Sequence, residues 1–112
     1  MLTRELAGAS VRPLILSILS EGESYGYAIL SRIEALSGGV LAWDDGTLYP
    51  VLHRMQNKGL LESSWRRADT GRRRKYYALT DKGRRALERE KQQWLQVDAM
   101  LAQLWGLQPR LT

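Results

Sequence analysis

The sequence predicts a mainly helical single domain with one small β-hairpin, an α+β fold. Three observations support this prediction. Apolar residues recur at helical spacing in three segments of the first half of the chain. Two strand-like segments flank the turn Ala68-Asp69-Thr70-Gly71. A long C-terminal segment then carries an apolar stripe with a heptad repeat.

The first helix is expected within residues 3 to 20, where leucine, isoleucine and valine form a broad apolar stripe. Pro13 lies inside this segment, and an interior proline loses a hydrogen bond and clashes with the preceding turn. The helix therefore either kinks at Pro13 or begins near Ser10, with Pro13 in its first turn. We favour the later start.

A second helix is predicted over residues 25 to 37, with Ser24 as its N-cap and Gly38-Gly39 after its end. Ile29, Ile33 and Leu36 form its expected buried face, together with one of two tyrosines, Tyr25 or Tyr27.

Residues 44 to 61 contain a third, short amphipathic helix. Leu48, Leu52 and Met55 recur at spacings of four and three and so share one face. Gly59 supplies the left-handed residue that ends the helix. The opposite face carries donors, acceptors and an aromatic ring but no carboxylate, which suits a polyanion; it comprises Thr47, Tyr49, His53, Arg54, Gln56 and Lys58.

The start of this third helix is limited by Pro50, which belongs near a helix N-terminus. Asp44 or Asp45 can accept hydrogen bonds from the free N–H groups there. A start at Asp45 requires a small kink, which Gly46 can absorb.

A two-stranded hairpin is predicted from Leu60 to Arg67 and from Arg72 to Leu79. Trp65 on its first strand is expected in the core, as is Trp43. The tip and second strand of this hairpin carry a dense set of cations, namely Arg66, Arg67, Arg72, Arg73, Arg74 and Lys75, against the single acid Asp69.

The last helix is predicted from residue 81 to about residue 105, with Thr80 as its cap. Its apolar stripe contains Leu87, Trp94, Val97, Leu101, Leu104 and Trp105. Such a helix spans roughly 37 Å, whereas a domain of this size has a radius of gyration near 13 Å. The far end therefore needs a partner, and a second copy of the chain is the simplest one. We accordingly divide the chain into a body, residues 1–79, and a dimerisation helix, residues 80–112, within one compact unit.

The charge is concentrated in one segment. The chain has 17 basic and 12 acidic residues, a net charge of +5. Residues 66 to 91 carry eleven of the basic and four of the acidic side chains, a local net charge of +7. This distribution predicts an anionic partner, of which nucleic acid is the leading candidate and an anionic lipid surface the lesser one.

Several classes of site and location are disfavoured. Without cysteine, disulfides and thiolate metal sites are excluded. His53 is the only histidine and there is no cysteine, so a metal role for His53 is not expected, and no cofactor is indicated. We see no secretory signal and no apolar run long enough to cross a membrane, which points to the cytoplasm.

The order of elements suits DNA. The major groove admits one helix, and the narrow, negative minor groove attracts arginines held on a thin projection. The start of the second helix can face a phosphate. The pattern therefore predicts a winged helix-turn-helix, whose dimers address two half-sites about one helical turn apart on a pseudo-palindromic operator.

The sequence also resembles the PadR family of bacterial transcriptional regulators. The resemblance is carried by runs in the second and third helices, the hairpin and the start of the last helix: Tyr25-Gly26-Tyr27, the run from Gly46 to Met55, Gly59-Leu60-Leu61, the run from Gly71 to Tyr77, and Leu79-Thr80-Asp81-Lys82-Gly83. It covers the chain from about residue 10 onward. The single C-terminal helix is similar to the family's short subgroup.

This resemblance implies a homodimer joined by the C-terminal helices, acting as a repressor released by a small aromatic or drug-like molecule. Trp94 matches a tryptophan that lines an apolar pocket between subunits in some short members. The implied DNA contacts are Thr47, Tyr49, Pro50, His53 and Arg54 in the recognition helix, Arg72, Arg73, Arg74 and Lys75 in the wing, and Tyr25 and Tyr27 in the second helix. The implied dimer or ligand-pocket residues are Leu87, Trp94, Val97, Leu101 and Trp105.

The same residues bear on other functions. No catalytic serine–histidine–acid set or glycine-rich phosphate loop is present, so an enzyme is not expected. The alternative to a regulator is an interaction module that binds a protein through the striped helix, while its basic segment binds nucleic acid non-specifically. RNA or a membrane surface remains a further alternative partner.

Overall fold

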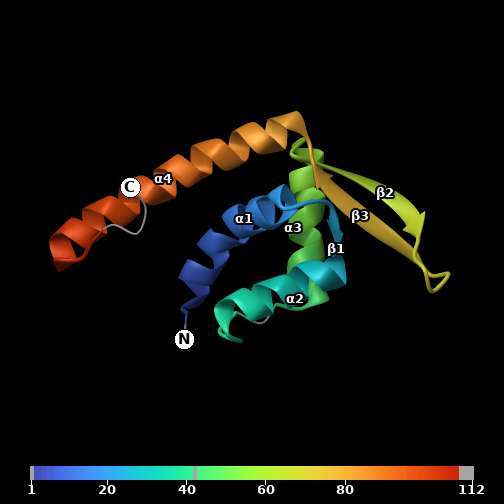
Figure 1. Cartoon of the computed structure of the whole chain (residues 1–112), viewed down its shortest axis with the longest axis horizontal. Coiled ribbons are helices and arrows are strands. Elements are labelled where there is room, and N and C mark those ends of the chain that lie inside the picture. The colour runs from blue at the N-terminus through green and yellow to red at the C-terminus, as the bar shows by residue number, and fades with distance from the viewer. Residues whose placement is uncertain (1, 42, 109–112) are drawn as a thin grey trace.

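The computed structural model describes residues 2–41 and 43–108, which form four helices and a three-stranded antiparallel sheet (Figure 1). The predicted α+β fold is confirmed. The predicted regions 1–79 and 80–112 also include Met1, Ala42 and residues 109–112, which lie outside the described residues. In chain order the elements are α1 (Arg4–Ser20), β1 (Ser24–Tyr25), α2 (Gly26–Ser37), α3 (Asp45–Asn57), β2 (Leu61–Arg67), β3 (Arg73–Leu79) and α4 (Asp81–Trp105).

Helix α1 begins well before Pro13, so the favoured start near Ser10 is wrong. Thr3 is its N-cap, and the Thr3 hydroxyl accepts a hydrogen bond from the Leu6 N–H at 3.2 Å. The proline lies in the interior of the helix, where it removes one backbone hydrogen bond. The cap and the good helix-forming residues around Ala7 outweigh that loss.

The segment before α2 is a strand, and Ser24 is not the N-cap of this helix. Ser24 and Tyr25 form β1, which pairs with Tyr77 and Tyr76 of β3, and Tyr25 occupies the cap position without a side-chain hydrogen bond. The sheet therefore has three strands in the order β1-β3-β2, rather than the two strands predicted. A two-residue strand is too short to produce a recognisable alternation of apolar and polar residues.

Helix α3 agrees with its prediction. The Asp44 carboxylate accepts a hydrogen bond from the Thr47 N–H at 2.9 Å, so the helix begins at Asp45 and contains Pro50. After the last helical residue, Asn57, the chain leaves the helix through Gly59, which has a φ of +79°. The predicted left-handed glycine is confirmed at this position.

The core lies where α1, α2 and α3 pack against the apolar end of the sheet. It is made of aliphatic side chains with one buried tyrosine, namely Val11, Ile15, Leu16, Ile18, Leu19, Ile29, Ile33, Leu48, Leu52, Met55, Leu60, Leu61, Tyr77, Leu79 and Ala86. Trp43 packs against this cluster, as predicted. Leu36, expected on the buried face of α2, is exposed instead.

Helix α4 starts beside the hairpin and extends past α1 to the opposite end of the molecule (Figure 1). Its predicted cap is confirmed, since the Thr80 hydroxyl accepts a hydrogen bond from the Gly83 N–H at 3.0 Å and donates one to the Gly59 carbonyl at 2.6 Å. Leu87 packs against the core of its own chain. The molecule consequently measures 53 × 30 × 22 Å, and the far part of α4 lies beyond the body.

Candidate nucleic-acid interface

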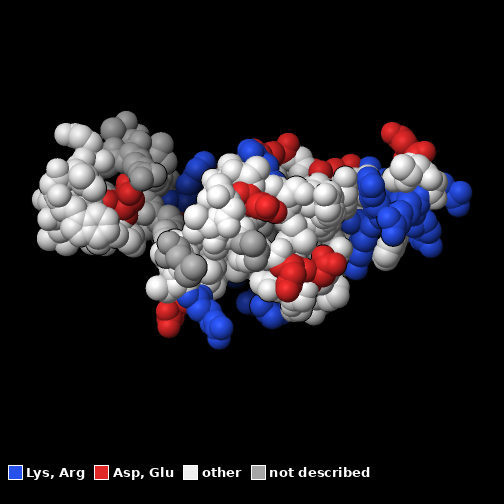
Figure 2. Space-filling view, turned by 90° about the horizontal axis from the view of Figure 1, so that it is seen from below, with Lys and Arg blue, Asp and Glu red and all other residues white. Residues whose placement is uncertain are grey.

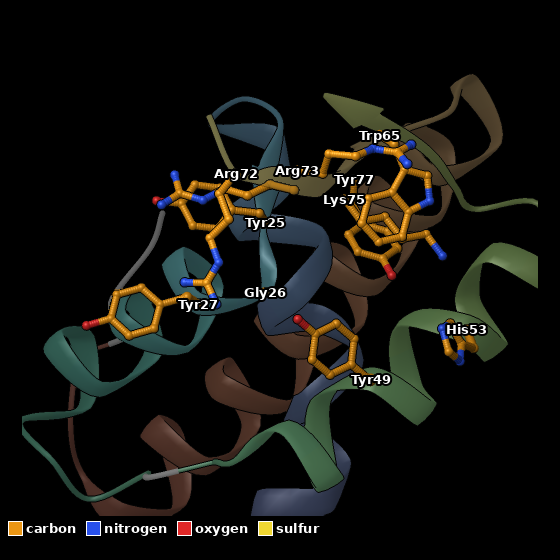
Figure 3. Close-up of a pocket in the computed structure, with 11 residues that line it drawn as sticks. Tyr25, Gly26, Tyr27, Tyr49, His53, Trp65, Arg72, Arg73, Lys75 and Tyr77 are labelled. Carbon is orange, nitrogen blue, oxygen red and sulfur yellow. The ribbon is translucent and has the colours of Figure 1, made fainter. Parts of the chain in front are cut away.

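A groove of about 710 Å³ separates the start of α2 and the face of α3 from the hairpin (Figure 3). Strand β1 is short and pairs only with Tyr76 and Tyr77 of β3. The groove lies next to the part of β3 that β1 does not cover, where Arg73, Arg74 and Lys75 line it. Its lining is aromatic and cationic, and comprises Tyr25, Gly26, Tyr27, Tyr49, His53, Trp65, Arg72, Arg73, Arg74, Lys75 and Tyr77. The fold thus brings predicted residues from three separate segments to one hollow.

On α3, the predicted recognition residues divide into two groups. Thr47, Pro50, His53 and Arg54 are exposed, as a side chain that reads bases must be. Tyr49 is half-buried and packs against the core. Burial raises the pKa of Tyr49 above its usual value, and the nearby Asp45 carboxylate adds to the rise.

The Tyr49 ring lies directly against the backbone of Gly26 at the start of α2 (Figure 3). A Cβ atom at Gly26 would lie 2.3 Å from the Tyr49 hydroxyl oxygen, so any larger residue there must displace the Tyr49 ring. This contact joins the first residue of α2 to the first turns of α3. It fixes how the two helices meet, and the sequence pattern did not single it out.

In the hairpin, each of four cations lies over an aromatic ring. The Arg66 guanidinium is 4.0 Å from the centre of the Tyr76 ring, and that of Arg74 is 4.4 Å from the Tyr25 ring. On the opposite sheet face, Arg73 is 5.3 Å from the Trp65 ring and the Lys75 ammonium is 5.4 Å from the Tyr77 ring. Arg66 also forms an ion pair with Glu23, at 2.5 Å. A ring contact by itself holds a cation in place without neutralising it, so Arg73, Arg74 and Lys75 present ordered positive charge.

These cations dominate one end of the molecule (Figure 2). In that view the Lys and Arg side chains gather over the hairpin, whereas the far end of α4 is mostly uncharged. The positive field predicted for residues 66 to 91 is therefore centred on the hairpin and borders the groove.

Two aromatic residues differ from expectation. Trp65, predicted in the core, is 57 % exposed, because the second half of β2 extends beyond the core and has no layer above it. Tyr25, predicted on the second helix, lies in β1 and is half-buried. Tyr27 is 75 % exposed on α2, so Tyr25 is the more buried of this pair.

Tyr77 also belongs to the groove, although the sequence reasoning did not select it. The strict alternation of β3 places Tyr77 on the same face as Lys75 and Arg73, which is the available signal in the sequence. Its side chain is fully buried, and burial raises the pKa of its hydroxyl.

A second feature lies where α4 passes α1. Ser10, Pro13, Leu14 and Ser17 of α1 and Trp94 of α4 surround a mainly apolar hollow of about 240 Å³. Beyond it α4 exposes Trp94, Val97, Met100, Leu104 and Trp105. Near the body, α4 is tied to α1 by the Arg12–Glu90 ion pair at 2.9 Å.

The described residues offer neither a metal site nor a membrane span. Within residues 2–41 and 43–108, no group of three or more histidine, cysteine or acidic side chains is placed to hold a metal ion. In the same described part of the chain, no helix is long and apolar enough to cross a membrane.

Two packed helices followed by a basic two-stranded wing define the winged-helix class of regulatory proteins. Within this class, residues 15–89 match the Transcriptional regulator PadR-like family. The chain belongs to this family. Its members are transcriptional regulators rather than enzymes, so the chain is a transcriptional regulator, which implies binding to DNA.

Individual relatives agree with this assignment. A transcriptional regulator of Mycobacterium tuberculosis is 38 % identical over 88 residues, covering 79 % of this chain and 78 % of that one. A transcriptional regulator of Escherichia coli is 35 % identical over 83 residues. The matched region is 74 % of this chain but only 38 % of the Escherichia coli protein. A PadR-like regulator of Bacillus cereus has a solved structure with a TM-score of 0.81 at 33 % identity, covering 90 % of this chain and 96 % of that one.

Proposed function

We propose that this regulator is a homodimeric repressor that binds a pseudo-palindromic site in double-stranded DNA through α3 and the wing, and that a small aromatic or drug-like molecule releases it. The observation that carries the proposal is the groove itself. His53 and Tyr49 of α3 and the cations Arg72, Arg73, Arg74 and Lys75 of the hairpin line one hollow at the most basic end of the molecule. Thr47, Pro50 and Arg54 lie on α3 outside this hollow. The site of action would be the cytoplasm, at the nucleoid.

Helix α3 is the element proposed to enter the major groove. Thr47, Pro50, His53 and Arg54 are exposed on it, and their hydroxyl, imidazole and guanidinium groups can hydrogen-bond to base edges. Tyr49 has a different role in this proposal. Because its ring is held against Gly26, it orients the helix and leaves its neighbours to contact the bases.

The wing is proposed to reach the adjacent minor groove. Arg72 and Arg73 are exposed at its tip, and Arg74 and Lys75 follow along the strand. Arginines held on a thin projection are attracted by the negative potential of a narrow minor groove. On the other side of the groove, the exposed Tyr27 offers a hydroxyl that can donate to a phosphate.

The dimer is proposed to form along α4. Five large apolar side chains are exposed on its distal part, including Trp94 at 41 % and Trp105 at 66 %. A contiguous apolar stripe on a helix that extends beyond its own domain suits burial against another subunit. Leu101 is half-buried on the same segment and Leu87 packs within its own chain, so Leu87 is the least suited of the predicted dimer residues.

The proposed effector site is the hollow beside Trp94. Its walls from α1 are mainly apolar, and an indole edge from α4 suits contact with a planar aromatic compound. A ligand there would press on both α1, which belongs to the DNA-binding body, and α4, which would hold the dimer. Quenching of fluorescence by planar aromatic compounds in the wild type, but not in Trp94→Phe, would support this site.

The alternative is a protein-interaction module whose basic segment binds nucleic acid non-specifically, and its main interaction differs in its response to salt. A dimer that contacts six to ten phosphates loses about 10³–10⁵-fold in affinity between 50 and 200 mM salt. Binding through the apolar stripe of α4 would change little over the same range, because apolar contacts are not screened by ions.

The proposal is tested by selecting bound fragments from genomic DNA and then comparing variants on the recovered site. Arg73→Ala should weaken binding to all sequences, whereas His53→Ala should change the sequence preference. Arg4→Ala is the matched control, because it removes an equal charge from the exposed first turn of α1, outside the groove. Recovery of no common site, or an unchanged preference in His53→Ala, would contradict the assignment of α3.

A further inference from the structure

We propose that the groove between α3 and the wing holds one sugar–phosphate strand of the duplex, and that the buried hydroxyl of Tyr77 donates a hydrogen bond to one of its phosphates. This inference rests on the proposed function and adds a specific contact to it. Neither Tyr77 nor its neighbour Trp65 was among the predicted DNA contacts.

The observation is an unpartnered polar atom. The Tyr77 side chain has an exposed fraction of 0 %, and its hydroxyl has no hydrogen-bond partner among the described residues. A buried hydroxyl without a partner is costly, so native proteins nearly always supply one. A partner from outside the chain removes that cost, which makes this atom a candidate ligand-binding group.

The position of the hydroxyl indicates what that partner is. Tyr77 lines the groove, and its hydroxyl points toward α3, where Tyr49 and His53 line the other side (Figure 3). When a helix occupies the major groove and a wing occupies the neighbouring minor groove, one backbone strand must run between them. The groove that separates α3 from the hairpin is therefore the place for that strand.

The chemistry of the walls suits a phosphodiester. Burial raises the pKa of Tyr77, so the phenol stays protonated and can donate to an anion. The Lys75 ammonium lies 5.4 Å from the Tyr77 ring centre and supplies a positive charge on the wall that Tyr77 also lines. A hydrogen bond from a neutral donor to an ionised acceptor is stronger than one between neutral groups.

Trp65 supplies the apolar part of this wall. Its indole is 57 % exposed, and Arg73 lies 5.3 Å from the ring centre. It lies one diagonal step from Tyr77 on the same sheet face, because Ser63 pairs with Tyr77 and Trp65 pairs with Lys75. An exposed indole between cations suits the apolar face of a deoxyribose. Lys75 and Trp65 both border the groove beside Tyr77, and the proposed contact requires side chains of this wall to rotate away from the hydroxyl.

The test compares Tyr77→Phe with the full-length wild type on a labelled duplex that contains the site recovered by selection. Tyr77→Phe should bind at least about tenfold more weakly, the loss typical of a hydrogen bond to a charged group. The same variant should unfold at a higher urea concentration without DNA, because it lacks the unpartnered hydroxyl. Tyr76→Phe is the control, since Tyr76 lies on the opposite sheet face against Arg66 and should change neither quantity.

A second measurement identifies the phosphate. Single neutral methylphosphonates are placed along the strand, and one position should weaken the wild type but cause no further loss in Tyr77→Phe. Two results would overturn the inference and leave the proposed function standing. One is equal affinity of wild type and Tyr77→Phe for the duplex. The other is that each methylphosphonate weakens Tyr77→Phe as much as it weakens the wild type. Failure of the wild type to bind any duplex would instead reject the proposed function.

The source of the phosphate is separated by a control with inorganic phosphate alone. The duplex should reduce acrylamide quenching of Trp65 fluorescence, measured as the difference between wild type and Trp65→Phe. If inorganic phosphate gives the same protection at millimolar concentration as the duplex, the groove is a free-phosphate site and the backbone assignment is wrong.

Discussion

The contact between Gly26 and Tyr49 yields the sharpest prediction about stability. In Gly26→Ala the new methyl group would lie 2.3 Å from the Tyr49 hydroxyl oxygen and 2.8 Å from Cζ. Ordinary contact begins near 3.4 Å, so the ring must retreat by about 1.1 Å. Overpacking of this kind costs about 1–3 kcal/mol. Because the first turns of α3 hold Tyr49, the substitution should also reduce affinity for the selected duplex.

The measurement is urea unfolding followed by circular dichroism at one fixed protein concentration, since the proposed dimer would have a stability that depends on concentration. Gly8→Ala is the matched control. A Cβ atom there meets nothing within 4 Å, so the control should gain about 0.5–1 kcal/mol from the better helix former.

A double-mutant comparison decides whether the ring is the cause. In a Tyr49→Ala background the obstacle is gone, so Gly26→Ala should be neutral or stabilising by up to about 1 kcal/mol. If Gly26→Ala lost equal stability in the wild type and in Tyr49→Ala, the proposed packing of the Tyr49 ring against α2 would be refuted.

Two further predictions concern the ends of helices. Thr80→Ala removes the hydroxyl that caps α4 and bonds to the Gly59 carbonyl, and it should cost about 1 kcal/mol in urea unfolding; an unchanged midpoint would contradict the role of the cap. The hydrogen bond from Arg32 lowers the pKa of Glu21 below its ordinary value of 4.5. The folded pKa is thus the lower one, so this pair stabilises fully above pH 4.5 and the stabilisation disappears as pH falls through the folded pKa. Glu21→Gln should therefore match wild type in acid and be less stable at neutral pH, and identical pH profiles would count against the pair.

Helix limits were predictable wherever a local chemical cause was visible in the sequence. Asp44 and Thr80 cap their helices as expected, and Gly59 ends α3, because each acts on its immediate neighbours. Pro13 misled the prediction, since a proline alone does not show that a cap upstream can outweigh it. Strand β1 was missed because its two residues become a strand only through pairing with β3.

The candidate site was predictable by residue type but not by arrangement. The cation cluster and the polar face of α3 were evident from composition and periodicity. The exposure of Trp65 was not, because alternation in β2 shows which face a side chain takes but not how far the core extends along the strand. Two features depend on contacts between segments far apart in the sequence, which residue spacing along the chain does not reveal. They are the packing of Tyr49 against Gly26 and the unpartnered hydroxyl of Tyr77.

The central claim is that both subunits bind one duplex, each through its α3 and its wing. In each subunit one sugar–phosphate strand lies between α3 and the wing. Hydroxyl-radical footprinting of the selected duplex tests it most directly. The account predicts two symmetry-related patches of protected sugars, centred about one helical turn apart, each including the strand between a contacted major groove and the adjacent minor groove. A single continuous footprint without symmetry, or no protected sugar under conditions of saturated binding, would contradict it.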